Sequence, residues 1–386
     1  MFVATNPRGV VRDDNGNDDD QSTIVDEDEN EDLTSLDWED MDEYQRTYVR
    51  QSDMDKRLIR KANTGNDRKL YMCLAQGANV ESRDAKGRTA LMISATKGNT
   101  QAMQHLLSYG ASVHTVDPCG RTALWYTQNP DIVASFIQLG ARLELTDSTR
   151  STALLHFAST GNLEVMDLLL RAGCDIDARD EKGRTPLMMA AASASADTCF
   201  LLLARGANTR ARDYEGNSAL VSCVEFHGDY WDLHLDKFSM LLERGFDVNV
   251  QNNMGNSALM VAAYHGYHGL VSMLVSAGAN LNLRNWNGDS ALMLAIRTEY
   301  YRTETFDMML ERVSGLYSPA KQAAATAGST PGSKASAAMA AFLVTKGADV
   351  RFQNNHGETA YDIAVKEQKA DIAQWLGAYL SEIAQG

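Results

Sequence analysis

One ten-residue stretch of the chain contains His227, Asp229, His234 and Asp236. Imidazole nitrogens and carboxylate oxygens are ligands that zinc and related metals accept. Their spacing implies no ligand geometry, however, and histidines are common in polar loops. The sequence therefore favours a polar loop over a metal site, and metal-dependent catalysis by residues 227–236 is kept only as a remote alternative function.

Other patterns that could support chemistry are weak or absent. Ser318 and Lys321 have the S-x-x-K spacing of some acyl-transfer enzymes, but the companion motifs are missing. Phosphate-binding glycine loops, zinc-protease motifs, nucleophile elbows and calcium-binding loops do not occur in the sequence. The five cysteines show no CxxC spacing, which is typical of reduced thiols in a cytosolic protein. We predict no catalytic, cofactor-binding or metal-binding residues, no cofactor and no enzymatic activity.

A phrase that reads approximately D-x-x-G-x-T-A-L recurs along the chain with a period near 33 residues. Its glycine suits a tight turn with positive φ, and the Thr or Ser two residues later can cap a helix. About twenty residues further on, phrases such as LLLRAGCD end a second helix at a glycine. One such unit cannot bury its apolar face alone, so the units must stack. The phrase starts at Asp84, Asp117, Asp147, Asp180, Asp213, Asn252, Asn285 and Asn354.

The period, the G-x-T-A-L phrase and the L-L-x-x-G-A phrase resemble the ankyrin repeat over about residues 52–386. The resemblance implies an all-α ankyrin-repeat solenoid of helix-turn-helix repeats with hairpin-like turns. A degenerate ninth copy is expected to open the array at Ser52. Residues 1–51 are then an acidic, largely disordered tail, and residues 314–336 are a flexible low-complexity insertion in the repeat that starts at Asn285.

Some repeats depart from the pattern. The repeat that starts at Asp117 is short, and Asn129-Pro130 is expected to interrupt its first helix. Arg150 replaces the turn glycine of the Asp147 repeat, which predicts a distorted turn. The Asp213 repeat has extra residues around residues 227–236, which lengthen the connection between its two helices.

Nearly all of the net charge of −15 lies at the N-terminus. Residues 1–43 carry 16 acidic residues against Arg8 and Arg12, a net charge of −14, so the remaining chain has a net charge of −1. Acidic and apolar residues alternate over residues 33–44, as in a short amphipathic helix that forms on binding. A solubilising leader explains the composition equally well. The apolar residues of this candidate tail motif are Leu33, Leu36, Trp38, Met41 and Tyr44.

The resemblance also implies a binding surface, because ankyrin partners usually contact the turn tips and the exposed end of the first helix. In this sequence, basic residues occupy these positions in the N-terminal half and aromatic or apolar residues in the C-terminal half. The basic residues could be a solvated face, and some of the aromatic residues could pack between repeats. The candidates are Arg83, Lys86, Arg88, Lys97, Arg121, Arg179, Lys182, Arg184, Arg212, Tyr214, Phe226, Met254, Tyr264, His265 and Trp286.

We predict an intracellular, cytoplasmic scaffold or adaptor that binds a partner protein on its concave ankyrin surface, with a tail that regulates access. The alternative is an inhibitor whose acidic tail blocks a basic enzyme or a nucleic-acid-binding surface. The nearly neutral repeats disfavour direct nucleic-acid binding, and no apolar run suggests membrane insertion. The protein is expected to be monomeric alone or one subunit of a larger complex. A nuclear location and delivery into another cell stay open.

Overall fold

The computed structural model describes residues 43–193, 195–225, 235–297 and 331–385. The chain divides into two units, residues 1–53 and 54–386. Of the first unit, only residues 43–53 are described, and they form the N-terminal part of one helix. The expected tail helix at residues 33–44 therefore lies almost entirely outside the described residues.

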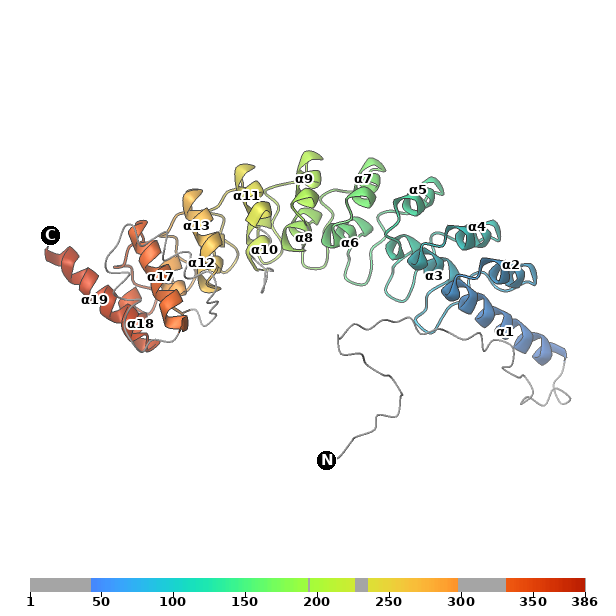
Figure 1. Ribbon diagram of the computed structural model, residues 1–386, viewed down its shortest axis with the longest axis horizontal. Helices are drawn as coiled ribbons and strands as arrows, with labels where there is room; N and C mark the ends of the chain where they lie inside the picture. The colour runs from blue at the N-terminus through green and yellow to red at the C-terminus, as the bar shows by residue number, and fades with distance from the viewer. Residues whose placement is uncertain (1–42, 194, 226–234, 298–330, 386) are drawn as a thin grey trace, which may run out of the picture. The chain divides into compact units, whose positions relative to one another are not determined.

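The expected all-α fold is confirmed, because the described residues form 17 α-helices and one 3₁₀ helix but no strand (Figure 1). In chain order these elements are α1 (Glu43–Thr64), α2 (Asp67–Ala75), α3 (Ala90–Lys97), α4 (Thr100–Ser108), η2 (Ala123–Tyr126), α5 (Pro130–Gln138), α6 (Ala153–Thr160), α7 (Leu163–Arg171), α8 (Pro186–Ser193), α9 (Ala196–Ala204), α10 (Ala219–Glu225), α11 (Leu235–Glu243), α12 (Ala258–Tyr264), α13 (His268–Ser276), α14 (Ala291–Arg297), α17 (Pro331–Thr345), α18 (Ala360–Lys366) and α19 (Ala370–Gln385).

The same turn recurs at all eight expected repeat starts. The backbone N–H of the first residue donates to the carbonyl four residues later, as from Asp84 to Arg88 at 2.9 Å and from Asn354 to Glu358 at 2.9 Å. The starting side chain closes the turn from inside, because Oδ1 of Asp84 accepts the N–H groups of Lys86 and Arg88. Sequence-local hydrogen bonds of this kind explain why Asp or Asn starts each turn.

Six of the eight turns lead into the first helix of their repeat through an N-cap hydroxyl, the exceptions being the turns before Thr122 and Ser290. Thr89, Thr152 and Ser257, for example, accept the N–H three residues later at 3.4, 3.4 and 3.3 Å. Such a cap typically stabilises a helix by about 1 kcal/mol. The repeat phrase therefore determines both where the turn lies and where the helix begins.

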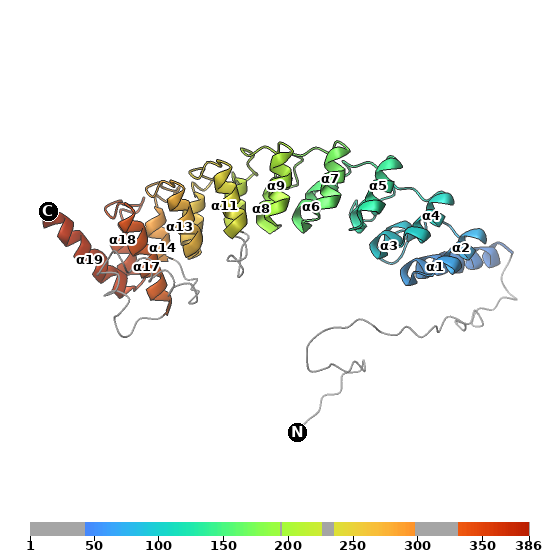
Figure 2. The ribbon, with the colours of Figure 1, turned by 45° about the horizontal axis from the view of Figure 1, so that its top comes forward.

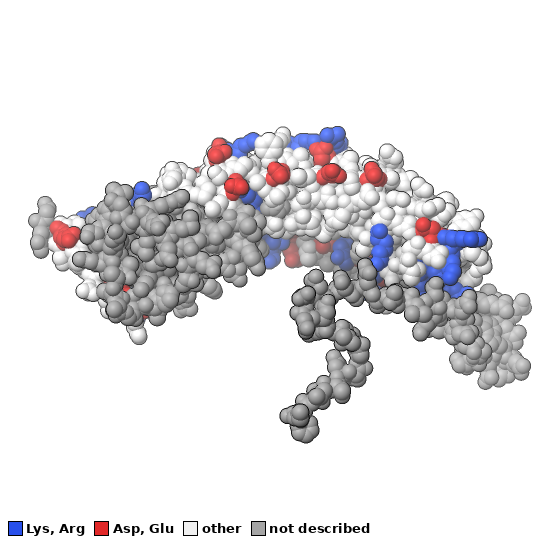
Figure 3. All heavy atoms as spheres, in the orientation of Figure 1, with Lys and Arg blue, Asp and Glu red and all other residues white. Residues whose placement is uncertain are grey.

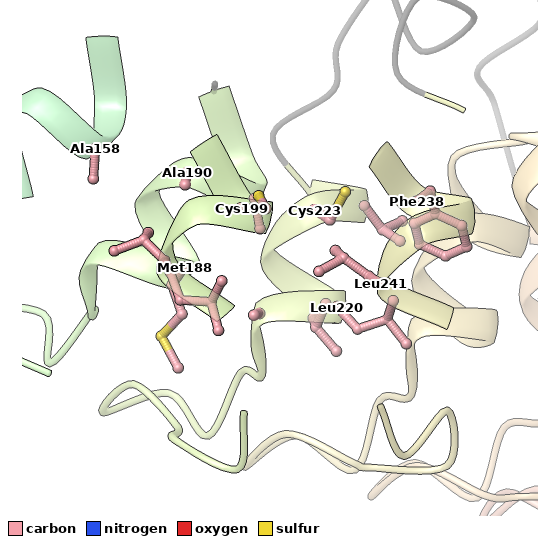
Figure 4. Close-up of a cluster of buried hydrophobic side chains, with 14 of the residues drawn as sticks. Ala158, Met188, Ala190, Cys199, Leu220, Cys223, Phe238 and Leu241 are labelled. Carbon is pink, nitrogen blue, oxygen red and sulfur yellow. The ribbon is translucent and has the colours of Figure 1, made fainter. Parts of the chain in front are cut away.

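Packing within residues 54–386 follows the order of the repeats (Figure 2). First helices contact first helices, from α6 to α8, α10, α12 and α14, and second helices contact one another from α5 to α7, α9, α11 and α13. Their apolar side chains form one buried cluster that extends from Leu58 to Leu376. Figure 4 shows side chains of this cluster, including Met188, Leu220 and Phe238, filling the space between neighbouring repeats. All five cysteines are free thiols, and only Cys119 is exposed.

The turn at Asp147 is not distorted, contrary to the expectation from Arg150. Asp147 donates to Ser151 at 2.9 Å and Arg150 donates to Asp147 at 2.9 Å, as in the glycine-containing turns. Arg150 instead adopts the glycine conformation, with φ of +59°. The turn geometry is kept because the surrounding hydrogen bonds hold it, and the backbone of Arg150 carries the strain.

Replacing Arg150 with glycine should therefore stabilise the protein. Left-handed backbone costs a side-chain-bearing residue about 1–2 kcal/mol, and the greater freedom of glycine in the unfolded chain cancels about 0.4–1 kcal/mol of the gain. We expect the free energy of unfolding to rise by about 0.5–1 kcal/mol in urea denaturation. Arg150→Ala is the matched control, since it removes the same side chain but keeps the strain. Equal stabilities of the two variants would contradict this account.

The proline in the Asp117 repeat has a different role from the one expected. Pro130 does not interrupt the first helix but is the first residue of the second helix, α5, where proline needs no N–H partner. Asn129 caps this helix by accepting the N–H of Asp131 at 2.9 Å. The missing residues shorten the first helix instead, which is reduced to the single 3₁₀ turn η2.

Two helices begin before the expected boundaries. Helix α1 starts at Glu43, not at Ser52, so residues 43–51, which the sequence analysis assigns to the tail, are helical. Helix α17 starts at Pro331, so residues 331–336 are helical and not part of a loop. Proline suits a first helical position, and the alanine-rich residues after it favour helix. Residues 314–330 of the expected insertion lie outside the described residues.

Candidate functional site

The tips of four consecutive turns form a continuous row, here called the tip row, of Lys182, Tyr214, Met254 and Trp286. The N–H of Tyr214 donates to the carbonyl of Lys182 at 2.9 Å, and the N–H of Trp286 donates to that of Met254 at 3.0 Å. Asn253 joins the two pairs, since its Nδ2 donates to the carbonyl of Tyr214 at 2.8 Å. The structure thus brings these four candidates together and fixes their backbones relative to one another.

The apolar members of the tip row face solvent. The exposed fractions are 60% for Tyr214, 59% for Met254 and 68% for Trp286. Isolated exposed apolar residues are normal, but three large ones on consecutive tips are characteristic of a contact surface. Their rigid backbone lowers the entropy that a partner must remove on binding.

Tyr264 and His265 lie away from the tip row. They are at the far end of α12 from the Asn252 turn, about 9 Å along the helix by its rise per residue. The rings of Tyr264 and His265 are 5.4 Å apart, and Tyr267 stacks on His265 at 5.4 Å. Burial lowers the pKa of His265. The expected aromatic patch is therefore two groups, and its remaining candidate, Phe226, lies outside the described residues.

Three of the candidate arginines form ion pairs within their own turns. Arg88, Arg121 and Arg184 contact the starting aspartates Asp84, Asp117 and Asp180 at 2.8, 2.9 and 2.7 Å. Burial raises the pKa of Asp84, but hydrogen bonds to Arg88 and its charge outweigh this and hold the pKa below its ordinary value. Much of the positive charge of these arginines is thus compensated within the turn.

Three other candidate arginines, Arg83, Arg179 and Arg212, precede the starting residues and connect neighbouring repeats. Nη1 of Arg83 donates to the carbonyls of Gly87 and Val116, both at 2.8 Å. Arg179 contacts the carbonyls of Gly183 and Arg212 at 2.7 and 2.6 Å. This role was not expected from the sequence. Its signal is a long side chain with a hydrogen-bond donor directly before the start of a repeat, which also occurs before Asn252 and Asn285 as Gln251 and Arg284.

The candidate lysines differ from the six candidate arginines in the contacts of their charged groups. Lys86, Lys97 and Lys182 are exposed, and their ammonium groups have no hydrogen-bond or ion-pair partner within the described part of the chain. Of the basic candidates, these three are therefore the best placed to meet an acidic group of a partner.

A group of three carboxylates surrounds Asn217, which was not expected from the sequence. The amide nitrogen of Asn217 lies 3.3 Å from Asp213, 3.4 Å from Glu215 and 3.4 Å from Glu225. Burial and the charges of Glu215 and Asp213 raise the pKa of Glu225 to about 6. The sequence signal is the residue at the fifth turn position, which is Arg in the turns that start at Asp84, Asp117 and Asp180 but Asn here. The Asp213 turn is therefore acidic, whereas the starting aspartates of those three turns are compensated by their arginines.

Of the four candidate metal ligands in residues 227–236, only Asp236 belongs to the described residues, since residues 227–234 lie outside them. Asp236 is exposed near the start of α11. Within the described ranges, no three His, Cys, Asp or Glu side chains are arranged to hold a metal ion. None of the described helices has an apolar stretch long enough to cross a lipid bilayer.

Comparison with known families agrees with the turn and helix geometry. Residues 58–147, 125–213, 182–252 and 230–317 match the family model for ankyrin repeats, described as three copies. The repeat that starts at Asn354 lies beyond these matches but has the same turn and N-cap. No curated protein matches the chain. The matches span residues 58–317, more than half of the chain, and the chain belongs to the ankyrin-repeat family.

Proposed function

We propose that the protein is a non-catalytic scaffold or adaptor that binds a partner protein through the tip row and the adjoining concave ankyrin surface. Ankyrin repeats generally mediate protein–protein interaction. The observation that carries the proposal is the exposure of Tyr214, Met254 and Trp286 on consecutive turns with fixed backbones. Trp and Tyr are enriched among residues that dominate binding energy.

The surroundings of the tip row indicate the chemistry of the partner. Lys182 lies at one end, and the carboxylates of Asp213 and Glu215 lie beside Tyr214 in the same turn. A partner that fits would insert apolar side chains between these tips and present an acidic group to Lys182 and a basic group to Glu215. Such paired charges fix orientation more than they add affinity.

Affinity capture followed by mass spectrometry tests the proposal. The baits are the full chain, the chain lacking residues 1–42, and a Tyr214→Ser/Trp286→Ser double variant. We expect at least one protein to be captured by the full chain and lost with the double variant. If every protein captured by the full chain is also captured by the double variant, the tip row is not the binding surface.

We propose that the acidic residues 1–43 regulate access to the binding surface; in the alternative function, the same residues are the inhibitory part of the protein. A net charge of −14 on residues 1–43 would compete with an acidic partner for basic groups such as Lys86 and Lys182. Deletion of residues 1–42 should then increase capture, with a smaller difference at high salt because screening weakens the competition. Loss of all capture on deletion would favour the alternative, an inhibitor that acts through its tail.

A further inference from the structure

A groove of about 770 Å³ crosses three second helices, α5, α7 and α9, away from the tip row. Its floor is apolar and includes Ala134, Leu163, Leu168 and Leu201. Phe200 stands in it with 51% of its surface exposed, and the guanidinium carbon of Arg244 lies 4.9 Å from the centre of its ring. An exposed phenylalanine in an apolar groove is unusual on a surface that only meets water.

Acidic side chains line the groove at equivalent positions of the three helices. Asp131, Glu164 and Asp197 are each the second residue of a helix, and all three are exposed. Their carboxylates have no ion-pair or hydrogen-bond partner among the residues that the structure describes. A fourth acid, Asp167, contacts both Arg171 and Arg205 and is already compensated. Figure 3 shows a row of acidic side chains along this face.

Stabilisation of helix N-termini explains part of this arrangement. An acidic residue in the first turn interacts favourably with the helix dipole, whatever its neighbours are. That effect explains each acid separately, but it does not explain why the acids border an apolar groove with an exposed phenylalanine. Uncompensated acids beside exposed apolar surface are complementary to a ligand that is both basic and apolar.

We propose that this groove is a second docking surface, which binds a basic amphipathic helix of a partner protein. Packed helices lie about 8–10 Å apart, so the three acids span about 20 Å. A helix of about 14 residues covers that distance. Two basic residues about seven positions apart lie on the same face of such a helix and about 10 Å apart, which is the spacing between neighbouring acids. Leucine-like side chains on the same face would enter the groove beside Phe200.

The acidic N-terminal segment of this chain is a poor occupant, because its net charge of −14 is repelled by the three carboxylates. A basic partner segment is attracted to them. This surface is also distinct from the tip row of the proposed function. Variants of Tyr214 or Trp286 should leave binding in the groove unchanged, so the two proposals can fail separately.

The test uses the full chain and a designed helical peptide of about 15 residues, with lysines about seven residues apart and leucines on the same face. The peptide carries a photo-crosslinker, and its affinity is measured by fluorescence anisotropy. Two control peptides replace lysine with glutamate or scramble the order of the residues. The protein variants are Asp131→Asn/Glu164→Gln/Asp197→Asn and, separately, Phe200→Ala.

The matched control variant removes three exposed acids elsewhere, as Glu181→Gln/Glu367→Gln/Glu382→Gln. We expect each groove variant to weaken the binding of the lysine peptide about tenfold and the control variant to change it less than about twofold. The crosslinks should lie on α5, α7 and α9, and the control peptides should bind weakly. The triple acid exchange removes three favourable charge–dipole contacts and should lower the melting temperature modestly, so binding is measured well below the melting temperature of every variant.

Three results would overturn the proposal. The first is equal binding of the lysine peptide by the groove variants and the unchanged protein. The second is crosslinking confined to residues 1–42, which would show that the peptide binds only the acidic segment. The third is dimer formation that Phe200→Ala abolishes in sedimentation, which would make a second copy of the chain the occupant.

Discussion

Replacing Gly255 with alanine should lower the free energy of unfolding by about 3 kcal/mol or more. Gly255 has φ of +76°, a conformation that costs a side-chain-bearing residue about 1–2 kcal/mol. A Cβ atom there would also lie 2.8 Å from Cα of Asn285 and 2.9 Å from N of Trp286. Both are backbone atoms of the next turn, so the two repeats must separate to admit the methyl group. Urea denaturation followed by circular dichroism measures the loss.

The last repeat provides the matched control. Gly357 occupies the same position of its turn with φ of +74°, but a Cβ atom there would meet no atom within 4 Å. Gly357→Ala should therefore show the conformational cost alone, about 0.5–1 kcal/mol once the lower entropy of alanine in the unfolded chain is subtracted. If the free energy of unfolding falls equally in Gly255→Ala and Gly357→Ala, the close contact with the next turn is not what excludes a side chain at position 255.

The destabilisation by Gly255→Ala should also be confined to particular repeats. Stability in repeat proteins is approximately a sum of repeat terms and nearest-neighbour interface terms. Gly255→Ala weakens the interface between the repeats that start at Asn252 and Asn285. Hydrogen exchange should therefore accelerate most in α12, α13 and α14, while α3 and α4 keep their protection.

The sequence predicted the repeats well because their determinants are local. Within eight residues of chain, Asp84 closes a turn, Gly87 supplies a positive φ and Thr89 caps a helix. Such a pattern needs no knowledge of distant contacts, which is why eight starts could be located. The turn at Asp147 shows where local patterns fail. Arg150 replaces the glycine there, yet the hydrogen bonds of the turn hold Arg150 in the left-handed conformation that glycine has in the other turns.

The candidate site was predicted less completely, because the partners of its side chains are far away in sequence. Arg83 contacts the carbonyl of Val116, 33 positions further along the chain, and sequence spacing alone did not distinguish it from the accessible Lys86. The groove beside Phe200 depends on the lateral packing of three second helices. Local patterns show only that each of these helices has an apolar face.

Trp286→Ala should reduce the affinity for a partner that binds the tip row by about 2 kcal/mol, roughly 30-fold in the dissociation constant. Trp286 is the most exposed of the three apolar residues of the row, at 68%, so the folded protein loses little buried area when its side chain is removed. Its backbone supports the fold, because its N–H donates to the carbonyl of Met254 and its carbonyl accepts from Asn355, and alanine keeps both bonds. The melting temperature should therefore hardly change.

The measurement is calorimetric titration of a captured partner with the unchanged protein, Trp286→Ala and Tyr71→Ala. Tyr71 is a matched aromatic control, 44% exposed on the second helix α2 and outside the tip row. Its variant should bind within about twofold of the unchanged protein, because residues outside the contact contribute little to affinity. A lower melting temperature for Trp286→Ala with unchanged affinity would instead show that Trp286 packs within the fold. In that case the tip row would be a structural seam between repeats, and the partner would have to bind elsewhere.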